Sequence, residues 1–409
     1  MSVSYNLPNE ILVKIFNFCD VYTLSQISMV CIQFNNVAKY ILMKKSEHLL
    51  VTNQKSEKFR ERCKPLLSSD INSKFITSYN WIYKKYKKRQ INDVMEGYGI
   101  NHINNNKCVL MTKNTVWFCG TNSNKLHAYN RAKNGTIEKG KKILCTDNAL
   151  IKCFALCDDY IISSDINGVI NRWEIKNDQN NFFLERLKIH DVHSRIIQIN
   201  ATSQHIITAS KNSIKILKYT NDRRGCTEEN EIFCGDVSSY IKSISFDPIR
   251  TKFAANSIYR YICKSSFLIY DIDKSYQIIN KNFESGCVQL IWENPHTILT
   301  CFYNSIKKID IRTSNFVVRS WDFPKYYALC CSSDNMYTFM TGHYRAAHLW
   351  DQRQNVAIQT YVNRLKIHSL EFDSTHMYGC TMGGLFELDF TEKNHFNHKG
   401  IKKHFSNIY

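Results

Sequence analysis

The chain has 409 residues, of which 44% are hydrophobic and 13% aromatic, so it can bury a large core and is not a disordered polymer. No apolar run approaches the roughly 18 residues that span a bilayer, and the N-terminus lacks the apolar core of a signal peptide. We therefore expect one large domain and one small one, with a formal net charge of +18 at pH 7.

Three short helical patterns occupy the first 45 residues. Pro8 suits the first turn of a helix, because its ring fixes φ and it lacks the N–H that would stay unpaired there. Residues 23–26 are predicted to be a capping box that opens the second helix. The apolar stripes are Ile11, Leu12, Ile15 and Phe16 in the first helix, Leu24, Ile27, Val30 and Cys31 in the second, and Phe34, Val37, Ala38 and Ile41 in the third.

Helices of this size cannot bury all this apolar surface among themselves, so a partner should cover part of it. The residues resemble an F-box, the segment that docks on the Skp1 adaptor of cullin-based ubiquitin ligases. The sequence departs from the family at Ile32 and Phe34, and the alternative is a helix pair that only caps the next domain. The positions that the resemblance implies for Skp1 binding are Leu7, Pro8, Glu10, Ile11, Leu12, Ile15, Phe16, Leu24, Ile27, Val30 and Cys31.

A basic segment follows these helices. Residues 44–90 hold thirteen Lys or Arg and four Asp or Glu. The net charge of this segment is therefore +9, which is half of the +18 of the whole chain. Residues 58–64 and 81–89 look helical, and we expect Trp81, Ile82 and Tyr86 to face a neighbour. Such a segment is a spacer whose aromatic residues dock on the next domain, or it binds nucleic acid or an anionic membrane surface.

Seven strand-like segments recur after residue 106, each with one large apolar anchor. Successive anchors are 44, 44, 53, 39, 41 and 38 residues apart, which is the blade period of a propeller. A turn signal lies 14 to 16 residues before the anchor in six units, and 23 residues before it in the fourth, which predicts an insertion near residues 259–265 in an outer loop. The anchors are Tyr129, Trp173, Leu217, Tyr270, Ile309, Trp350 and Leu388.

The seven units resemble WD repeats, with Trp350-Asp351 the closest match. Gly342-His343 looks like the dipeptide that starts a repeat, but it lies only seven residues before Trp350, so we discount it. The expected fold is mainly β: a seven-bladed WD40-type β-propeller at residues 107–390, because each blade must pack on the next. A small all-α F-box (1–45) and a basic, mainly helical linker (46–106) precede it, and a basic tail (391–409) follows. The alternative is an unrelated β-sandwich.

We expect no catalysis and no metal or other cofactor. The chain contains no P-loop, no G-x-S-x-G, no H-E-x-x-H and no dinucleotide-binding motif. His190 and His193 are spaced like ligands on a helix, but in a β-rich repeat this spacing directs them to opposite faces. The 16 cysteines lack a C-x-x-C pair and are expected to be buried thiols of a cytoplasmic or nuclear protein.

Together the two modules resemble the F-box/WD-repeat family, within which the chain looks most like the dactylin type. The resemblance implies a non-catalytic substrate receptor. Its F-box recruits Skp1, cullin and a RING subunit, and its propeller holds an unknown target protein for ubiquitination. Ubiquitin transfer is then faster because the target is held close to the ligase.

Propellers usually bind on the face ringed by the loops that lead into the inner strands. Arginine captures carboxylate or phosphate, and aromatic residues anchor a peptide, although ordinary exposed loops carry the same residues. The candidates for the target-binding face are Arg195, Tyr240, Lys325, Tyr326 and Arg364.

The alternative function is that of a WD-repeat scaffold which binds RNA or an anionic surface through its basic linker. Its affinity should then depend steeply on salt. Neutralisation of Lys84, Lys85, Lys87, Lys88 and Arg89 should abolish that binding.

Overall fold

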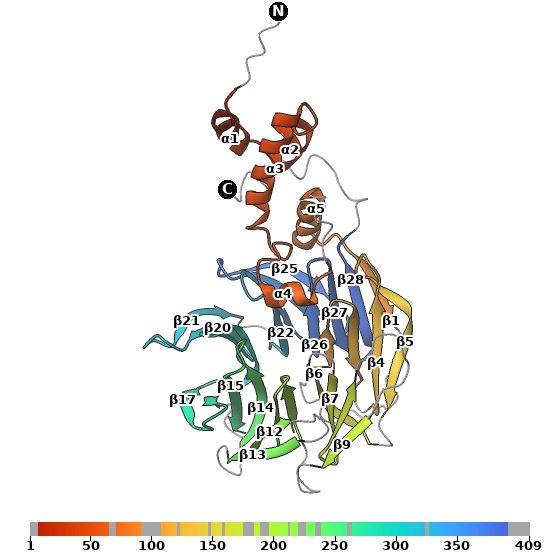
Figure 1. Ribbon diagram of the computed structural model, residues 1–409, viewed down its shortest axis with the longest axis vertical. Helices are drawn as coiled ribbons and strands as arrows, with labels where there is room; N and C mark the ends of the chain where they lie inside the picture. Colours follow the sequence, from red (N-terminus) through yellow and green to blue (C-terminus); the bar gives the residue numbers. More distant parts are fainter. Residues whose placement is uncertain are drawn as a thin grey trace, which may run out of the picture.

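The computed structural model describes residues 7–64, 71–91, 108–120, 123–145, 149–157, 160–174, 184–188, 196–211, 213–219, 226–233, 239–259, 264–323 and 327–391. Within these ranges five helices precede or flank a large array of β-strands (Figure 1). The helices are α1 (Asn9–Asn17), α2 (Val21–Ile27), α3 (Ile32–Ser46), α4 (Glu57–Arg62) and α5 (Ile71–Ile82).

The strands form seven four-stranded antiparallel sheets, the blades of a propeller, as the repeat period predicts. Blade 1 contains β2 (Val109–Met111), β3 (Thr115–Cys119), β4 (Lys125–Arg131) and β5 (Ile137–Cys145); blade 2 contains β6 (Ile151–Cys157), β7 (Tyr160–Asp165), β8 (Val169–Glu174) and β9 (Leu184–Lys188); blade 3 contains β10 (Gln198–Ala201), β11 (His205–Ala209), β12 (Ser213–Tyr219) and β13 (Cys226–Phe233); blade 4 contains β14 (Ser239–Phe246), β15 (Lys252–Tyr259), β16 (Ser265–Asp271) and β17 (Gln277–Phe283); blade 5 contains β18 (Cys287–Asn294), β19 (Thr297–Phe302), β20 (Ser305–Asp310) and β21 (Val317–Asp322); blade 6 contains β22 (Cys330–Ser333), β23 (Thr338–Gly342), β24 (Ala346–Asp351) and β25 (Ala357–Val362); blade 7 contains β26 (Ser369–Phe372), β27 (His376–Thr381), β28 (Gly384–Asp389) and β1 (Lys87–Ile91).

The predicted register of the repeats is confirmed. All seven anchor residues lie in the third strand of their blade and are buried. The turn signals lie between the first and second strands, where the carboxylates of Asp247, Asp334 and Asp373 accept hydrogen bonds from backbone N–H groups of their own turns. In blade 1 the hydroxyl of Thr112 fulfils this role, one residue before the predicted signal. Residues 158–159 lie outside the described residues.

Closure of the ring corrects the prediction that residues 81–89 are helical. Helix α5 ends at Ile82, and Lys87–Ile91 instead forms β1, the outer strand of blade 7, which pairs with β28. The free edge of β28 offers backbone groups that a strand satisfies and a helix cannot. The propeller therefore begins before residue 107, and an N-terminal strand completes its last blade.

The ends of the second helix were also predicted wrongly. Asp20, rather than Thr23, is its N-cap: the Asp20 carboxylate accepts a 2.7 Å hydrogen bond from the Thr23 backbone N–H. An aspartate three residues upstream caps the helix better than the threonine and makes Thr23 the third helical residue. The helix ends at Ile27, so Val30 lies in the following turn and Cys31 is the N-cap of α3.

The insertion of blade 4 lies between its second and third strands, β15 and β16. Both β14 and β15 are eight residues long. Residues 260–263 and the basic tail beyond Thr391 lie outside the described residues.

Candidate partner-binding surfaces

The core of the N-terminal helices is formed by only some of the residues predicted to bind Skp1. Leu12, Phe16 and Leu24 are at most 4% exposed. They pack with residues of α3 and of α5, and the rings of Phe16 and Phe34 meet edge to face at 5.2 Å. Part of the apolar surface is therefore covered by this chain itself.

The rest of the predicted set stays exposed. Leu7 is 49%, Ile11 41% and Ile15 48% exposed on or beside α1, and Val30 is 68% exposed in the turn before α3. The Gln33 amide donates hydrogen bonds to the Leu7 carbonyl at 2.8 Å and to the Asn9 side chain at 3.0 Å, so the start of α1 is fixed beside the start of α3. Pro8, Glu10 and Cys31 are exposed as well, and Ile27 is half-buried.

Sequence reasoning missed several exposed apolar residues of this region, among them Met29 at 71% and Ile32 at 83%. These two are chain neighbours of Val30 and Cys31. Ile32 is one of the two positions at which the chain departs from the F-box pattern, and this departure was the signal that could have drawn attention to it. We call the exposed residues Leu7, Ile11, Ile15, Val30 and Ile32 the apolar F-box face. Exposed apolar patches of this kind mark binding sites for other proteins.

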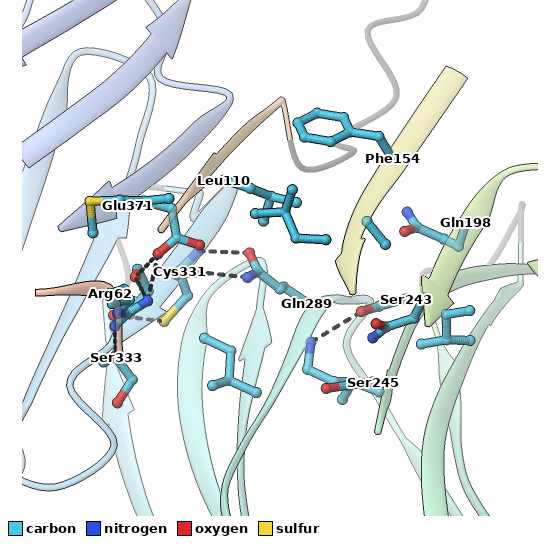
Figure 2. A pocket seen from close by; sticks show the side chains of 18 of the residues that line it. Arg62, Leu110, Phe154, Gln198, Ser243, Ser245, Gln289, Cys331, Ser333 and Glu371 are labelled. Atoms are coloured by element: carbon cyan, nitrogen blue, oxygen red, sulfur yellow. Dashed lines mark hydrogen bonds and ion pairs between the residues drawn. The ribbon is translucent and has the colours of Figure 1, made fainter. Parts of the chain in front are cut away.

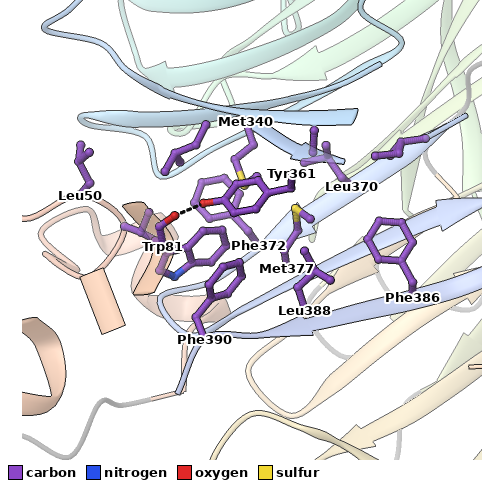
Figure 3. Packing of buried hydrophobic residues seen from close by; sticks show 14 of the residues in the cluster. Leu50, Trp81, Met340, Tyr361, Leu370, Phe372, Met377, Phe386, Leu388 and Phe390 are labelled. Carbon is purple, nitrogen blue, oxygen red and sulfur yellow. Dashed lines mark hydrogen bonds between the residues drawn. The ribbon is translucent and has the colours of Figure 1, made fainter. Parts of the chain in front are cut away.

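Helix α5 connects the N-terminal helices to the propeller. Its residues Phe75 and Tyr79 belong to the core of the N-terminal helices, whereas Trp81 is fully buried against the propeller. The Trp81 ring stacks on Phe390 with centroids 3.7 Å apart (Figure 3). Its N–H donates a hydrogen bond to the Ser374 carbonyl at 3.1 Å. Ile82 and Tyr86 pack on the same cluster, so the prediction that these aromatic and apolar residues dock on a neighbour is confirmed.

The segment before α5, residues 48–64, covers one face of the propeller. The Asn53 amide donates to the Asp334 carboxylate at 3.5 Å, the Gln54 amide donates to the Ser374 hydroxyl at 2.9 Å, and the Lys64 ammonium donates to Asn114 at 3.0 Å. These partners lie in turns between the first and second strands of three blades. We call this end of the propeller the helix face; the inner strands run toward it, so they begin at the opposite face.

Helix α4 lies at the end of the central channel on the helix face. A cavity of about 410 Å³ is lined by the first strands of all seven blades and by Lys58, Glu61 and Arg62 of α4. The Arg62 guanidinium pairs with the buried Glu371 carboxylate at 2.7 Å and also donates to the Ser333 carbonyl (Figure 2). Basic residues of the segment are thus used inside the fold.

The predicted target-binding residues lie on the opposite face, as far as the structure describes them. Arg364 is exposed in the connection that leads into β26, and Tyr240 is half-buried near the start of β14. Arg195, Lys325 and Tyr326 lie outside the described residues, as do His190 and His193. The helix face is occupied by the chain itself, so the opposite face is the available one.

The discounted dipeptide has a structural role in blade 6. His343 follows β23 and lies between the second and third strands, so it does not start a repeat. Its ring and the Thr341 hydroxyl are 2.7 Å apart, and the Trp350 indole donates to the same hydroxyl at 3.0 Å. Burial, together with the nearby His348, lowers the pKa of His343 to about 3. A neutral histidine therefore tethers the loop to the blade.

The basic residues proposed for the alternative function are partly engaged. Arg89 pairs with Glu387 at 2.6 Å, and Lys88 donates to Asn363 at 2.8 Å. Among the described residues, no group of His, Cys, Asp and Glu is arranged to hold a metal ion. None of the described helices has the length and apolarity needed to cross a membrane.

Comparisons with known proteins agree with both parts of this architecture. Residues 5–45 match the family model described as F-box-like. The β-propeller domain of Myceliophteria thermophila Cps50 (Swd1) superposes with a TM-score of 0.57 at 8% identity, covering 74% of this chain and 99% of that one. The WD40 β-propeller domain of Doa1 gives 0.56 at 11% identity, with 76% and 98% covered, and the Dos1 propeller gives 0.51 at 14%, with 68% and 75% covered.

No curated protein sequence matches the chain significantly. The identities to the solved structures establish the fold alone. The chain therefore carries an F-box-like domain at residues 5–45 and belongs, by fold, to the seven-bladed WD40-type β-propellers.

Proposed function

We propose that the chain is the substrate-recognition subunit of a Skp1–cullin–F-box ubiquitin ligase. The observation that carries this proposal is the apolar F-box face, which stays exposed although α5 already packs against the other side of the same helices. The match of residues 5–45 to an F-box-like domain supports Skp1 as the partner of this face. Cullin and a RING subunit would join through Skp1.

The attachment of the F-box to the propeller supports the receptor role. Residues 48–64 and α5 bind the helix face through hydrogen bonds and the buried Trp81, so the F-box has a defined position relative to the blades. The opposite face then presents the target, with Tyr240 and Arg364 among the residues that contact it. Ubiquitin transfer is accelerated by proximity, and the chain itself performs no bond-breaking chemistry.

The overall arrangement of a near-terminal F-box, a basic linker and degenerate repeats supports the dactylin type within the F-box/WD-repeat family. We propose a cytoplasmic or nuclear location for this receptor. Most cysteines of the described residues are buried thiols, which is consistent with a reducing compartment.

The test is assembly of the complex from purified subunits. Skp1, cullin and the RING subunit are mixed with the intact chain, with Val30→Glu, or with the control Val362→Glu. The control replaces a similarly exposed valine at the end of β25. We expect co-elution of all subunits with the intact chain and the control, and its loss in Val30→Glu. A folded intact chain that does not bind Skp1 contradicts the proposal. RNA binding that is lost when Lys84, Lys85 and Lys87 are neutralised would instead support the scaffold function.

A further inference from the structure

Five exposed apolar side chains lie on the face opposite the helix face, all in blades 6 and 7. Tyr327 is 71% exposed in the connection that leads into β22, and Tyr344 is 63% exposed in the turn between β23 and β24. Val362 ends β25, Leu365 follows it in the connection into β26, and Met382 lies in the turn between β27 and β28; each is at least 44% exposed. We call these five residues the distal apolar surface. Contiguous apolar patches on a folded protein mark sites of interaction.

Contacts between the loops make this surface continuous from blade 6 to blade 7. The backbone N–H of Asn363 donates to the Arg345 carbonyl at 2.8 Å, so the connection into β26 runs beside the turn between β23 and β24. Leu365 lies against the turn that carries Met382, because a Cβ atom added at Gly383 would be only 3.0 Å from the Leu365 side chain.

The connection that carries Tyr327 is fixed to its neighbours in the same way. The Leu329 N–H donates to the Gly342 carbonyl at 2.8 Å, which places this connection beside the end of β23. Toward blade 5, the Ala328 N–H donates to the Tyr303 carbonyl at 2.8 Å, and the rings of Tyr303 and Tyr327 meet edge to face with centroids 6.2 Å apart. The Tyr327 ring is therefore supported from one side while most of it stays exposed.

The charge of these loops is positive. The loops 327–329, 343–345, 363–368 and 382–383 contain Arg345, Arg364 and Lys366 and no Asp or Glu. Both arginines are exposed. The exposed Asp322 lies on the blade 5 side, at the end of β21, so the positive charge lies over blades 6 and 7. Tyr, Met and Arg are enriched in protein–protein interfaces and Asp and Glu are depleted there, so this composition is typical of an interface.

We propose that the distal apolar surface binds a segment of the target protein that carries Asp or Glu beside an apolar side chain. Arg345 and Arg364 pair with its carboxylates, which fit the planar guanidinium group, and Tyr327 and Tyr344 pack against its apolar side chain. RNA fits this surface less well, because aliphatic side chains such as Leu365 offer no ring on which a base can stack. The inference rests on the proposed receptor function, since it names the chemistry of the target on the same face.

The surface is tested with the full chain and a phage-displayed library of random, unphosphorylated dodecapeptides. The selected peptides are synthesised, and their affinities are measured by fluorescence polarisation. The variant is Tyr344→Ala with Arg345→Glu, which changes two exposed residues of one turn. The control is Tyr276→Ala with Lys274→Glu, a matched pair of exposed residues in the turn between β16 and β17, which lies at the helix face.

We expect the selected peptides to combine Asp or Glu with an aromatic or aliphatic residue, and to bind the variant at least about tenfold more weakly than the intact chain and the control. Selection of no peptide, or of peptides without this pattern, overturns the proposal, and so does equal affinity for all three proteins. A peptide that binds only when it carries phosphoserine would overturn the assignment to carboxylates. Binding of single-stranded RNA that depends on Tyr344 and Arg345, without peptide binding, would overturn the assignment to a protein target.

The affinity of Skp1 for the same three proteins separates this proposal from the receptor function. We expect it to be unchanged in the variant, because Tyr344 and Arg345 lie on the face away from the N-terminal helices. Peptide binding without Skp1 binding would support the distal apolar surface and contradict the receptor function. Skp1 binding without peptide binding would overturn the distal apolar surface alone.

Discussion

Replacement of Trp81 by alanine should detach α5 from the propeller at a large and calculable cost. The indole is fully buried, stacks on Phe390 and donates a hydrogen bond to the Ser374 carbonyl, while the Tyr361 hydroxyl donates to the Trp81 carbonyl. A buried tryptophan covers about 150–250 Å², which at about 25 cal/mol per Å² corresponds to roughly 4–6 kcal/mol. Measured losses for such truncations are about 3–5 kcal/mol, so we expect about 4 kcal/mol.

The assay is guanidinium unfolding followed by far-UV circular dichroism, on the intact chain, Trp81→Ala and Trp81→Phe. Phenylalanine keeps the stacking partner of Phe390 and loses the hydrogen bond to Ser374, so it should lower the free energy of unfolding by only about 1–2 kcal/mol. A decrease of less than about 1 kcal/mol in the free energy of unfolding of Trp81→Ala would refute the reasoning, since the removal of a fully buried tryptophan from an interdomain contact should cost several times more.

Three further predictions follow from buried groups. Leu12→Ala should lower the free energy of unfolding by about 3 kcal/mol, whereas Ile11→Ala, on the exposed side of the same helix, should change it by less than about 0.5 kcal/mol in the same denaturation assay. Arg62→Met should cost about 3–5 kcal/mol because it removes the guanidinium that pairs with the buried Glu371 carboxylate, and combining it with Glu371→Gln should recover part of that loss in a double-mutant cycle. Because the pKa of His343 is lower in the folded state than in the unfolded state, the stabilising contribution of the neutral ring is complete above about pH 6.5 and falls as the pH decreases toward about 3. Between pH 7 and pH 5 this accounts for about 2 kcal/mol of lost stability, which should disappear in His343→Gln. Denaturation at both pH values measures the loss, and an unchanged pH dependence in the variant would contradict the reasoning.

The propeller could be predicted because its repeat is visible in the chain. The anchors from Tyr129 to Leu388 recur at one period, and each occupies the third strand of its blade. The turn residues were equally informative, since an aspartate such as Asp373 bonds to its own backbone and needs no distant partner. Local patterns thus determine both the number of blades and their register.

Other features depend on distant contacts and could not be read from local patterns. The five residues of β1 are mostly charged, and they form a strand only because β28, about 300 residues later, leaves an edge unpaired. In α1, Ile11 and Leu12 follow each other in one apolar pattern. Only the positions of α3 and α5 decide that Leu12 is buried and Ile11 is exposed.

The receptor function is tested most directly by the affinity of Skp1 for the intact, folded chain, measured by isothermal titration calorimetry. The variant is the pair Ile11→Glu with Ile15→Glu on the apolar F-box face, and the control is Ile249→Glu, an exposed isoleucine in the turn between β14 and β15. Buried apolar anchors contribute about 2 kcal/mol or more each, so the double variant should bind at least about a hundredfold more weakly while the control binds normally. No binding by the intact chain, or the same affinity in the double variant, would contradict the account.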